Sequence, residues 1–161
     1  NNIDRSEVNW ENFVSEFCRI INRYSKDTSV ILIEMGVRFS NHFKNTVESK
    51  TQFRMKQIFN TRYRGGGKLL PLHIMYFTYE NPLGFNESII TDTYGDDCTD
   101  KILQQCAYKN AVILDPCCGF GRTLRMAHKY NMIFRGNEIN KKRLDKAIKY
   151  ARKKIWKKQI E

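Results

Sequence analysis

The chain has 161 residues and a mass of 19.1 kDa, the size of one ordinary domain. Its 28 Lys and Arg residues exceed its 17 Asp and Glu residues, which gives a formal net charge of +11. The hydrophobic content of 41% excludes a disordered chain, because such chains lack the apolar surface that offsets ordering entropy. A membrane-spanning helix is also excluded, since the wholly apolar runs reach only four residues, as in Val30–Ile33.

The excess of positive charge predicts a polyanionic partner, most often a nucleic acid, with a basic surface that serves solubility as the alternative. Five cysteines are present, and none has the Cys-x-x-Cys spacing of a zinc site. This usage favours reduced thiols and therefore an intracellular protein, cytoplasmic or nuclear. Because the chain begins with Asn1 and not with Met, we expect it to be a fragment or a trimmed chain.

In the first half of the chain, apolar spacing predicts a helix, a strand, a second helix and two further strands. Their predicted ranges are 9–24, 29–34, 38–49, 52–60 and 72–79. Asn9 is the predicted N-cap of the first helix. Residues 62–68 indicate a basic, flexible loop that lacks the spacing of a phosphate-binding P-loop. We take Arg62, Arg64 and Lys68 in this loop as candidate nucleic-acid-binding residues.

In the second half, residues 86–97 are polar and indicate a loop, and Thr99 is the predicted N-cap of the next helix. A strand, a helix, a strand and a final helix follow, at 111–114, 122–130, 132–138 and 141–158. This alternation favours a parallel, doubly wound sheet. The final helix carries ten basic residues and one acidic residue, which suits either a phosphate-facing surface or a solvated helix face.

The most informative segment joins the strand at 111–114 to the helix that follows. Gly119 and Gly121 permit a tight turn and a close approach of the backbone to a ligand. Asp115 ends the strand, at the edge where open α/β sheets bind ligands. Glu138 ends the next strand, at a distance along the chain where an acidic side chain can accept both hydroxyls of a ribose. The third glycine of a dinucleotide site is missing, which disfavours NAD. Glycines that only permit packing are the alternative.

The sequence Asp115-Pro-Cys-Cys-Gly-Phe-Gly-Arg-Thr123 resembles the Asp-Pro-Phe-Cys-Gly-Ser-Gly-Thr-Thr motif of S-adenosylmethionine-dependent methyltransferases. It is most similar to the DNA amino-methyltransferases that modify adenine N6 or cytosine N4. Residues 136–140, Gly-Asn-Glu-Ile-Asn, resemble that family's Gly-Ile-Glu-Ile-Asn element. The resemblance implies an α/β fold, a Rossmann-like class I methyltransferase sheet with helices on both faces. It also implies S-adenosylmethionine as the cofactor and DNA as the partner, with RNA as a weaker alternative.

By this resemblance, Asp115, Cys117, Gly119 and Gly121 would surround the methionine part of the cofactor. Glu138 would hold the ribose, and Ile139 would pack on the adenine. The same motif adds four further candidate cofactor-binding residues: Pro116, Cys118, Phe120 and Thr123. Phe120 and Arg122 replace residues that are small in the family. Cys117 and Cys118 could instead form a reactive thiol pair, because thiol pKa values fall near helix N-termini.

The order of elements resembles a permuted class of these enzymes, in which the catalytic motif precedes the cofactor motif. One methyltransferase-like domain would then cover residues 1–161, with a catalytic-side half at 1–85 and a cofactor-binding half at 86–161. We expect no membrane partner, because the sequence lacks an apolar run long enough to span a bilayer.

The family's catalytic motif, a polar residue followed by Pro-Pro and an aromatic residue, does not occur in the sequence. Asn81-Pro-Leu-Gly-Phe85 is its nearest relative, and it lacks the second proline. We therefore expect about 40 residues, with two strands and the catalytic motif, to precede Asn1 or to come from a second chain. The alternatives are an RNA guanine amino-methyltransferase and a non-catalytic subunit that keeps the cofactor fold.

Overall fold

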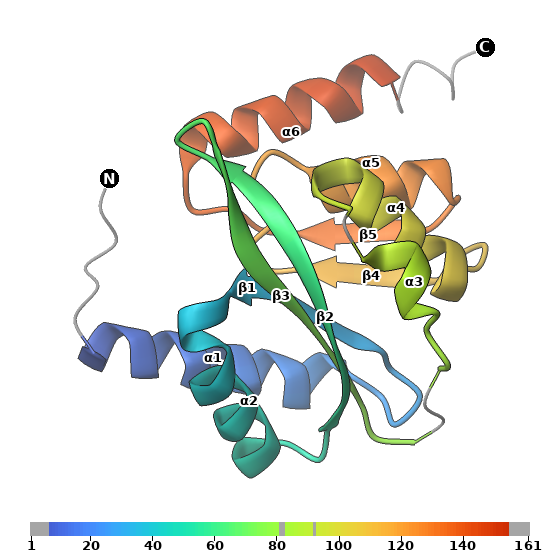
Figure 1. Cartoon of the computed structure of the whole chain (residues 1–161). Coiled ribbons are helices and arrows are strands. Elements are labelled where there is room, and N and C mark those ends of the chain that lie inside the picture. Colours follow the sequence, from blue (N-terminus) through green and yellow to red (C-terminus); the bar gives the residue numbers. More distant parts are fainter. Residues whose placement is uncertain (1–6, 81–82, 92, 155–161) are drawn as a thin grey trace. The chain divides into compact units, whose positions relative to one another are not determined.

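The computed structural model describes residues 7–80, 83–91 and 93–154, and Figure 1 shows their arrangement into helices and strands. The chain divides into two compact units, an N-terminal unit at Asn1–Thr93 and a C-terminal unit at Tyr94–Glu161. Each unit contains its own sheet. None of the described helices is long and apolar enough to cross a membrane.

The N-terminal unit is built on an antiparallel sheet of three strands. In chain order its elements are α1 (Glu7–Tyr24), β1 (Ile31–Gly36), α2 (Val37–Lys50), β2 (Arg54–Gly65), β3 (Lys68–Thr78) and α3 (Glu87–Ile90). The strand order is β1-β3-β2, so β3 is central. The second half of β3 is nearly all buried, which explains why its sequence is apolar on both faces.

One face of this sheet is covered by α1 and α2, as Figure 1 shows. The buried cluster on that face takes residues from both helices and from the strands: Val14, Cys18, Ile21, Phe43, Val47, Ile31, Ile33, Phe53, Met75 and Phe77. On the opposite face, the ring of Phe85 packs edge-on against Phe59 and Tyr76. The Tyr76 hydroxyl also accepts a hydrogen bond from the Leu83 backbone N–H at 2.6 Å. Both faces of the sheet are therefore occupied.

The prediction of a flexible loop at 62–68 is wrong. Strand β2 continues to Gly65, and Gly65 pairs with Lys68 at the end of a β-hairpin. The turn consists of Gly66 and Gly67, at φ +57° and +78°, and two positive φ values are the requirement of a type I′ turn. Arg62 and Arg64 thus lie on a hydrogen-bonded strand.

The C-terminal unit contains the elements α4 (Gly95–Cys106), β4 (Val112–Asp115), α5 (Arg122–Lys129), β5 (Ile133–Gly136) and α6 (Lys141–Lys154). Strands β4 and β5 are parallel, joined by α5. The prediction of a parallel strand–helix–strand unit is therefore confirmed here, whereas β1, β2 and β3 are antiparallel. Residues 155–158 of the predicted last helix lie outside the described residues.

Two predicted helix starts are wrong. Helix α4 has Tyr94 as its N-cap, and Thr99 lies inside the helix with its hydroxyl donating to the Gly95 carbonyl at 3.2 Å. Helix α1 already includes Glu7, so Asn9 is not its cap. The predicted loop 86–97 also contains helix α3, whose N-cap Asn86 accepts a hydrogen bond from the Ser88 N–H. Several short polar residues near a helix start are suitable N-caps, and tertiary contacts decide at which residue the helix begins.

Candidate functional site

The segment after β4 forms a tight turn, which we call the glycine turn (residues 115–121). The Asp115 carboxylate organises it, because Oδ1 accepts a hydrogen bond from the Cys117 N–H at 3.0 Å and Oδ2 accepts one from the Thr123 hydroxyl. Two backbone hydrogen bonds tie the turn to the end of β5: Asn137 N–H to the Asp115 carbonyl at 3.0 Å, and Cys118 N–H to the Asn137 carbonyl at 2.9 Å. The carboxyl ends of both parallel strands therefore form one edge.

Both predicted glycines are required by the backbone. Gly119 and Gly121 have φ values of +55° and +78°, a region that L-residues with side chains rarely adopt. A Cβ at Gly121 would lie 3.0 Å from the Ala147 Cβ, so this glycine also permits close packing of α6. A Cβ at Gly119 would meet nothing closer than the Glu138 carboxylate oxygen Oε2 at 3.9 Å. Gly119 therefore opens toward Glu138.

Glu138 and Ile139 present an acceptor and an apolar side chain next to each other. The half-buried Glu138 accepts a hydrogen bond from the Asn140 N–H through Oε1 at 2.7 Å, which fixes the carboxylate near Gly119. The Ile139 side chain is 93% exposed, although it is large and apolar. An exposed Ile beside an oriented carboxylate is the arrangement that a ligand with an apolar ring and hydroxyl groups can use.

The pKa values of the two adjacent cysteines are both raised. Cys117 is an exposed residue and Cys118 is buried, and desolvation of each sulfur is the largest cause that raises its pKa. The negative charges of Asp115 and Glu138 raise both pKa values further. Thiols of raised pKa are protonated at neutral pH and are poor nucleophiles. The direction of both pKa shifts is therefore opposite to the one that the reactive pair, the alternative considered from the sequence, would need.

The remaining predicted residues of the glycine turn have distinct positions. Pro116, which follows Asp115 in the sequence, is half-buried. The side chain of Phe120 is 51% exposed. The Phe120 ring lies beside α6, with the Lys146 Nζ 4.9 Å and the Arg143 Cζ 5.5 Å from its centroid. The structure thus gathers Asp115, Thr123, Gly119 and Glu138, and it places Phe120 against α6.

The three candidate nucleic-acid-binding residues lie on the β2–β3 hairpin of the N-terminal unit (residues 54–78). Arg62, Arg64 and Lys68 are all exposed. Strand β1 pairs only with Leu72–Phe77 of β3, so the tip of the hairpin extends past the third strand as a two-stranded ribbon. The whole hairpin holds five basic residues and no acidic residue.

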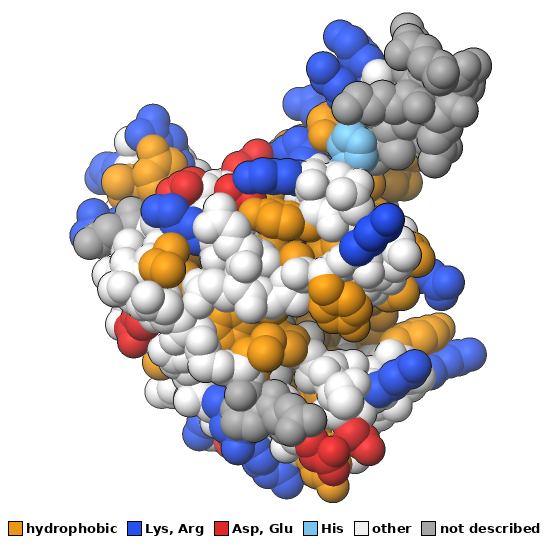
Figure 2. Space-filling view, turned by 90° about the vertical axis from the view of Figure 1, so that its right-hand side faces the viewer, with side chains coloured by type: hydrophobic (Ala, Val, Ile, Leu, Met, Phe, Trp, Pro, Cys, Tyr) orange, Lys and Arg blue, Asp and Glu red, His pale blue; other side chains and the backbone are white. Residues whose placement is uncertain are grey.

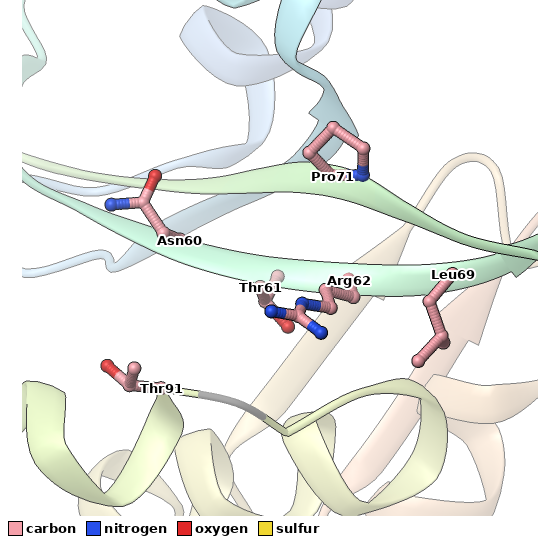
Figure 3. A pocket seen from close by; sticks show the side chains of 6 residues that line it. All are labelled: Asn60, Thr61, Arg62, Leu69, Pro71 and Thr91. Carbon is pink, nitrogen blue, oxygen red and sulfur yellow. The ribbon is translucent and has the colours of Figure 1, made fainter.

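A cavity of about 390 Å³ lies against this ribbon. Its lining residues come from β2, β3 and the segment after α3: Asn60, Thr61, Arg62, Leu69, Pro71 and Thr91. Figure 3 shows the side chains of Arg62 and Leu69 on the side of the hairpin that faces the Thr91 segment. Thr91 was not among the residues predicted for this surface, because no local pattern in the sequence brings it next to β2. The Gly66-Gly67 pair between two predicted strands was the available signal for the hairpin.

No catalytic residue is assigned by the structure. Asn81 and Pro82, in the segment nearest to the family's catalytic motif, lie outside the described residues. Phe85, the aromatic residue of that segment, is 7% exposed and belongs to the core against Phe59 and Tyr76. Among the described residues, no group of three or more His, Cys, Asp and Glu side chains is placed to hold a metal ion.

No family model and no curated protein matches the sequence. Solved structures do match the fold. The match with the structure of M1.HpyAVI spans 86% of this chain and 80% of the M1.HpyAVI chain, with a TM-score of 0.69 and 17% sequence identity. Its complex with S-adenosylmethionine gives a TM-score of 0.70 at 16% identity, over 86% of this chain and 82% of the other.

A third structure is TTHA0409 of Thermus thermophilus, provisionally assigned as a DNA modification methylase and complexed with S-adenosyl-L-methionine. It has a TM-score of 0.67 and 16% identity, and covers 89% of this chain and 79% of its own. At these identities the matches establish a shared fold. The chain therefore has the mixed α/β fold of these solved structures, which confirms the fold class expected from the resemblance.

Proposed function

We propose that this chain is the cofactor-binding part of an S-adenosylmethionine-dependent DNA methyltransferase that acts on an exocyclic amino group of adenine or cytosine. The observation that carries the proposal is the edge formed by the glycine turn and Glu138, in which Gly119 opens toward an oriented carboxylate. The same kind of fold holds S-adenosylmethionine in M1.HpyAVI and TTHA0409.

The residues at this edge fit the cofactor. Glu138 is a hydrogen-bond acceptor for the two ribose hydroxyls, and the exposed Ile139 is an apolar surface for the adenine. Gly119 leaves room for the methionine part, since a side chain there would point at the Glu138 carboxylate. Asp115 and Thr123 act as positioning residues, because they hydrogen-bond each other and the turn backbone. When bound, the cofactor supplies an electrophilic methyl group.

The proposed substrate is DNA, and the β2–β3 hairpin is the proposed contact. Arg62, Arg64 and Lys68 place positive charge on a two-stranded β-ribbon, and such a ribbon fits the major groove of B-DNA. The match with TTHA0409 supports a substrate of this class, because TTHA0409 carries a provisional assignment as a DNA modification methylase. Arginine and lysine side chains at the ribbon would contact phosphates or guanine edges.

A second candidate function is a non-catalytic cofactor-binding subunit. It is favoured by one observation, since the three prolines of the sequence, Pro71, Pro82 and Pro116, are all isolated, and the sequence thus holds no Pro-Pro-aromatic motif.

The same observation sets a requirement for the proposed enzyme. It would take its Pro-Pro-aromatic catalytic motif from residues outside this sequence, either upstream in the same protein or in a second chain. Residues 1–85 and 86–161 would then be two halves of one methyltransferase domain.

Calorimetric binding of small ligands tests the cofactor site. S-adenosylmethionine and S-adenosylhomocysteine are expected to bind and to compete with each other, whereas NAD is expected not to bind, because the turn lacks the third glycine of a dinucleotide site. Binding of NAD in place of S-adenosylmethionine would overturn the proposal.

Mass spectrometry of nucleosides tests the substrate. After incubation with the cofactor and nucleic acid, methylated adenine or cytosine in DNA supports the enzyme. Cofactor binding without methyl transfer, in the presence of a segment that carries the Pro-Pro motif, supports the non-catalytic subunit. Methylated guanine in RNA would contradict the DNA assignment.

A further inference from the structure

Helix α6 carries four lysines along one side. Lys142, Lys146, Lys149 and Lys153 are spaced by four, three and four residues, which places them on one face of an α-helix. All four are exposed. We call this row the lysine stripe, and its eleven residue steps span about 16 Å along the helix axis. Figure 2 shows Lys and Arg side chains gathered over the last turns of α6.

The lysine stripe differs from the other cationic surface of the C-terminal unit. On α5, Arg125 and Lys129 form ion pairs with Asp96 and Asp100 of α4, at 2.7 Å and 2.6 Å. On α6, the acidic residue Asp145 pairs with Lys141, which is not part of the stripe. Among the described residues, the structure gives no carboxylate partner to the four stripe lysines.

This arrangement is unfavourable for the helix by itself. Lys142 and Lys146 are four residues apart, as are Lys149 and Lys153, and like charges at this spacing repel each other. A row of repelling ammonium groups becomes favourable when a polyanion lies along it and releases its counterions. The row is long enough for about five phosphates of one DNA strand, at 3.4 Å per phosphate along the axis.

An exposed aromatic ring lies beside Lys146, the second lysine of the stripe. Phe120, on the glycine turn, lies with its centroid 4.9 Å from the Lys146 Nζ. The contact places the stripe beside the same turn that would hold the cofactor. Aromatic rings with neighbouring cations are a recurrent feature of single-stranded and duplex nucleic-acid surfaces.

We infer that the lysine stripe of α6 binds the phosphate backbone of a nucleic acid, separately from the β2–β3 hairpin. The inference extends the proposed function, since DNA is the substrate class named there. An anionic membrane is a poorer occupant, because a membrane-binding helix inserts its apolar face, and the apolar side of α6 is turned inward, with Ala147 4% exposed against Gly121. Lysine point charges without base-reading partners predict binding that is independent of sequence.

The test is the salt dependence of binding to a 20-base-pair duplex. The fourfold variant Lys142→Gln, Lys146→Gln, Lys149→Gln and Lys153→Gln removes four charges, so the slope of log K against log salt becomes shallower by about 3.6 if all four contact phosphates. Between 50 and 200 mM salt, the wild type then loses about 150-fold more affinity than the variant.

The matched control removes four lysines outside the stripe, Lys26, Lys44, Lys50 and Lys109, by the same substitution. It has the same net charge as the stripe variant and is expected to keep the wild-type slope to within about one unit. A stripe variant whose slope equals that of the control overturns the inference. Binding of the wild type to phosphatidylserine vesicles but not to DNA also overturns it.

Cofactor binding is measured on the same samples, so that the two proposals fail separately. The triple variant Lys142→Gln, Lys149→Gln and Lys153→Gln keeps the contact of Lys146 with Phe120, so it is expected to bind S-adenosylmethionine like the wild type while its salt slope becomes shallower by about 2.7. Unaltered cofactor binding with an unaltered slope refutes the stripe alone, and absent cofactor binding in the wild type refutes the proposed function alone. Where the fourfold variant does not fold, the pair Lys149→Gln and Lys153→Gln, with about half the slope change, decides the question.

Discussion

Gly121→Ala is expected to destabilise the C-terminal unit strongly. The alanine must adopt the φ of +78° that Gly121 has, and this left-handed conformation costs a residue with a Cβ about 1–2 kcal/mol. It would also lie 3.0 Å from the Ala147 Cβ and 3.4 Å from the Ala147 Cα, and overpacking of this kind costs about 1–3 kcal/mol. The free energy of unfolding should therefore fall by about 2–5 kcal/mol.

Two companion variants separate the causes. Gly119→Ala, at φ +55° with no atom nearer than 3.9 Å, should cost only the conformational part of about 1–2 kcal/mol. Ala147→Gly in the Gly121→Ala background removes the close contact, at a helix cost of about 1 kcal/mol. The double-mutant cycle of Gly121 and Ala147 should therefore show a favourable coupling of about 1–3 kcal/mol.

Urea unfolding followed by circular dichroism measures these free energies, and hydrogen exchange of the α5 and α6 amides assigns them to the C-terminal unit. If Gly121→Ala proves no more destabilising than Gly119→Ala, α6 does not pack on the glycine turn as described, and the reasoning is refuted.

Three further predictions concern individual residues. Hydrogen bonds from Lys129, the larger cause, and from Tyr130 lower the pKa of Asp100. The ionised carboxylate therefore stabilises the folded state fully above about pH 4, and this contribution is lost as the pH falls through the lowered pKa. Asp100→Asn should therefore flatten the acid limb of stability against pH, which acid titration of unfolding measures. Phe59→Ala, at a fully buried position, should cost the N-terminal unit about 3–5 kcal/mol in urea unfolding. Cys117, with its raised pKa, should react with iodoacetamide at pH 7.5 more slowly than free cysteine, by mass spectrometry.

The local features of the glycine turn could be predicted from the sequence. Asp115, Gly119 and Gly121 lie within seven consecutive positions, and a strand–turn–helix with two glycines has few alternative conformations. Glu138 could be placed at the same edge because parallel strands joined by one helix end together. The parallel pairing of β4 with β5 was predictable for the same reason.

The full length of the hairpin was not predicted, although strands at 52–60 and 72–79 were, because the segment between them was interpreted as a loop. Arg62 to Gly67 combines charge with three successive glycines, a composition typical of loops. The ladder of β2 with β3 overrides this local tendency, and the two glycines at positive φ make the turn. The ion pair between Asp96 and Arg125, 29 residues apart, also depends on tertiary packing that no local pattern records.

The central claim is that the edge formed by Gly119 and Glu138 binds S-adenosylmethionine, and isothermal calorimetry with a charge-removing variant tests it most directly. Glu138→Gln keeps the shape of the side chain but loses charge-assisted hydrogen bonds to the ribose, so the dissociation constant should rise by about 10- to 150-fold. Glu16→Gln, on the exposed surface of α1, is the matched control and should bind like the wild type. Equal dissociation constants for all three proteins, or no binding by the wild type, would contradict the account.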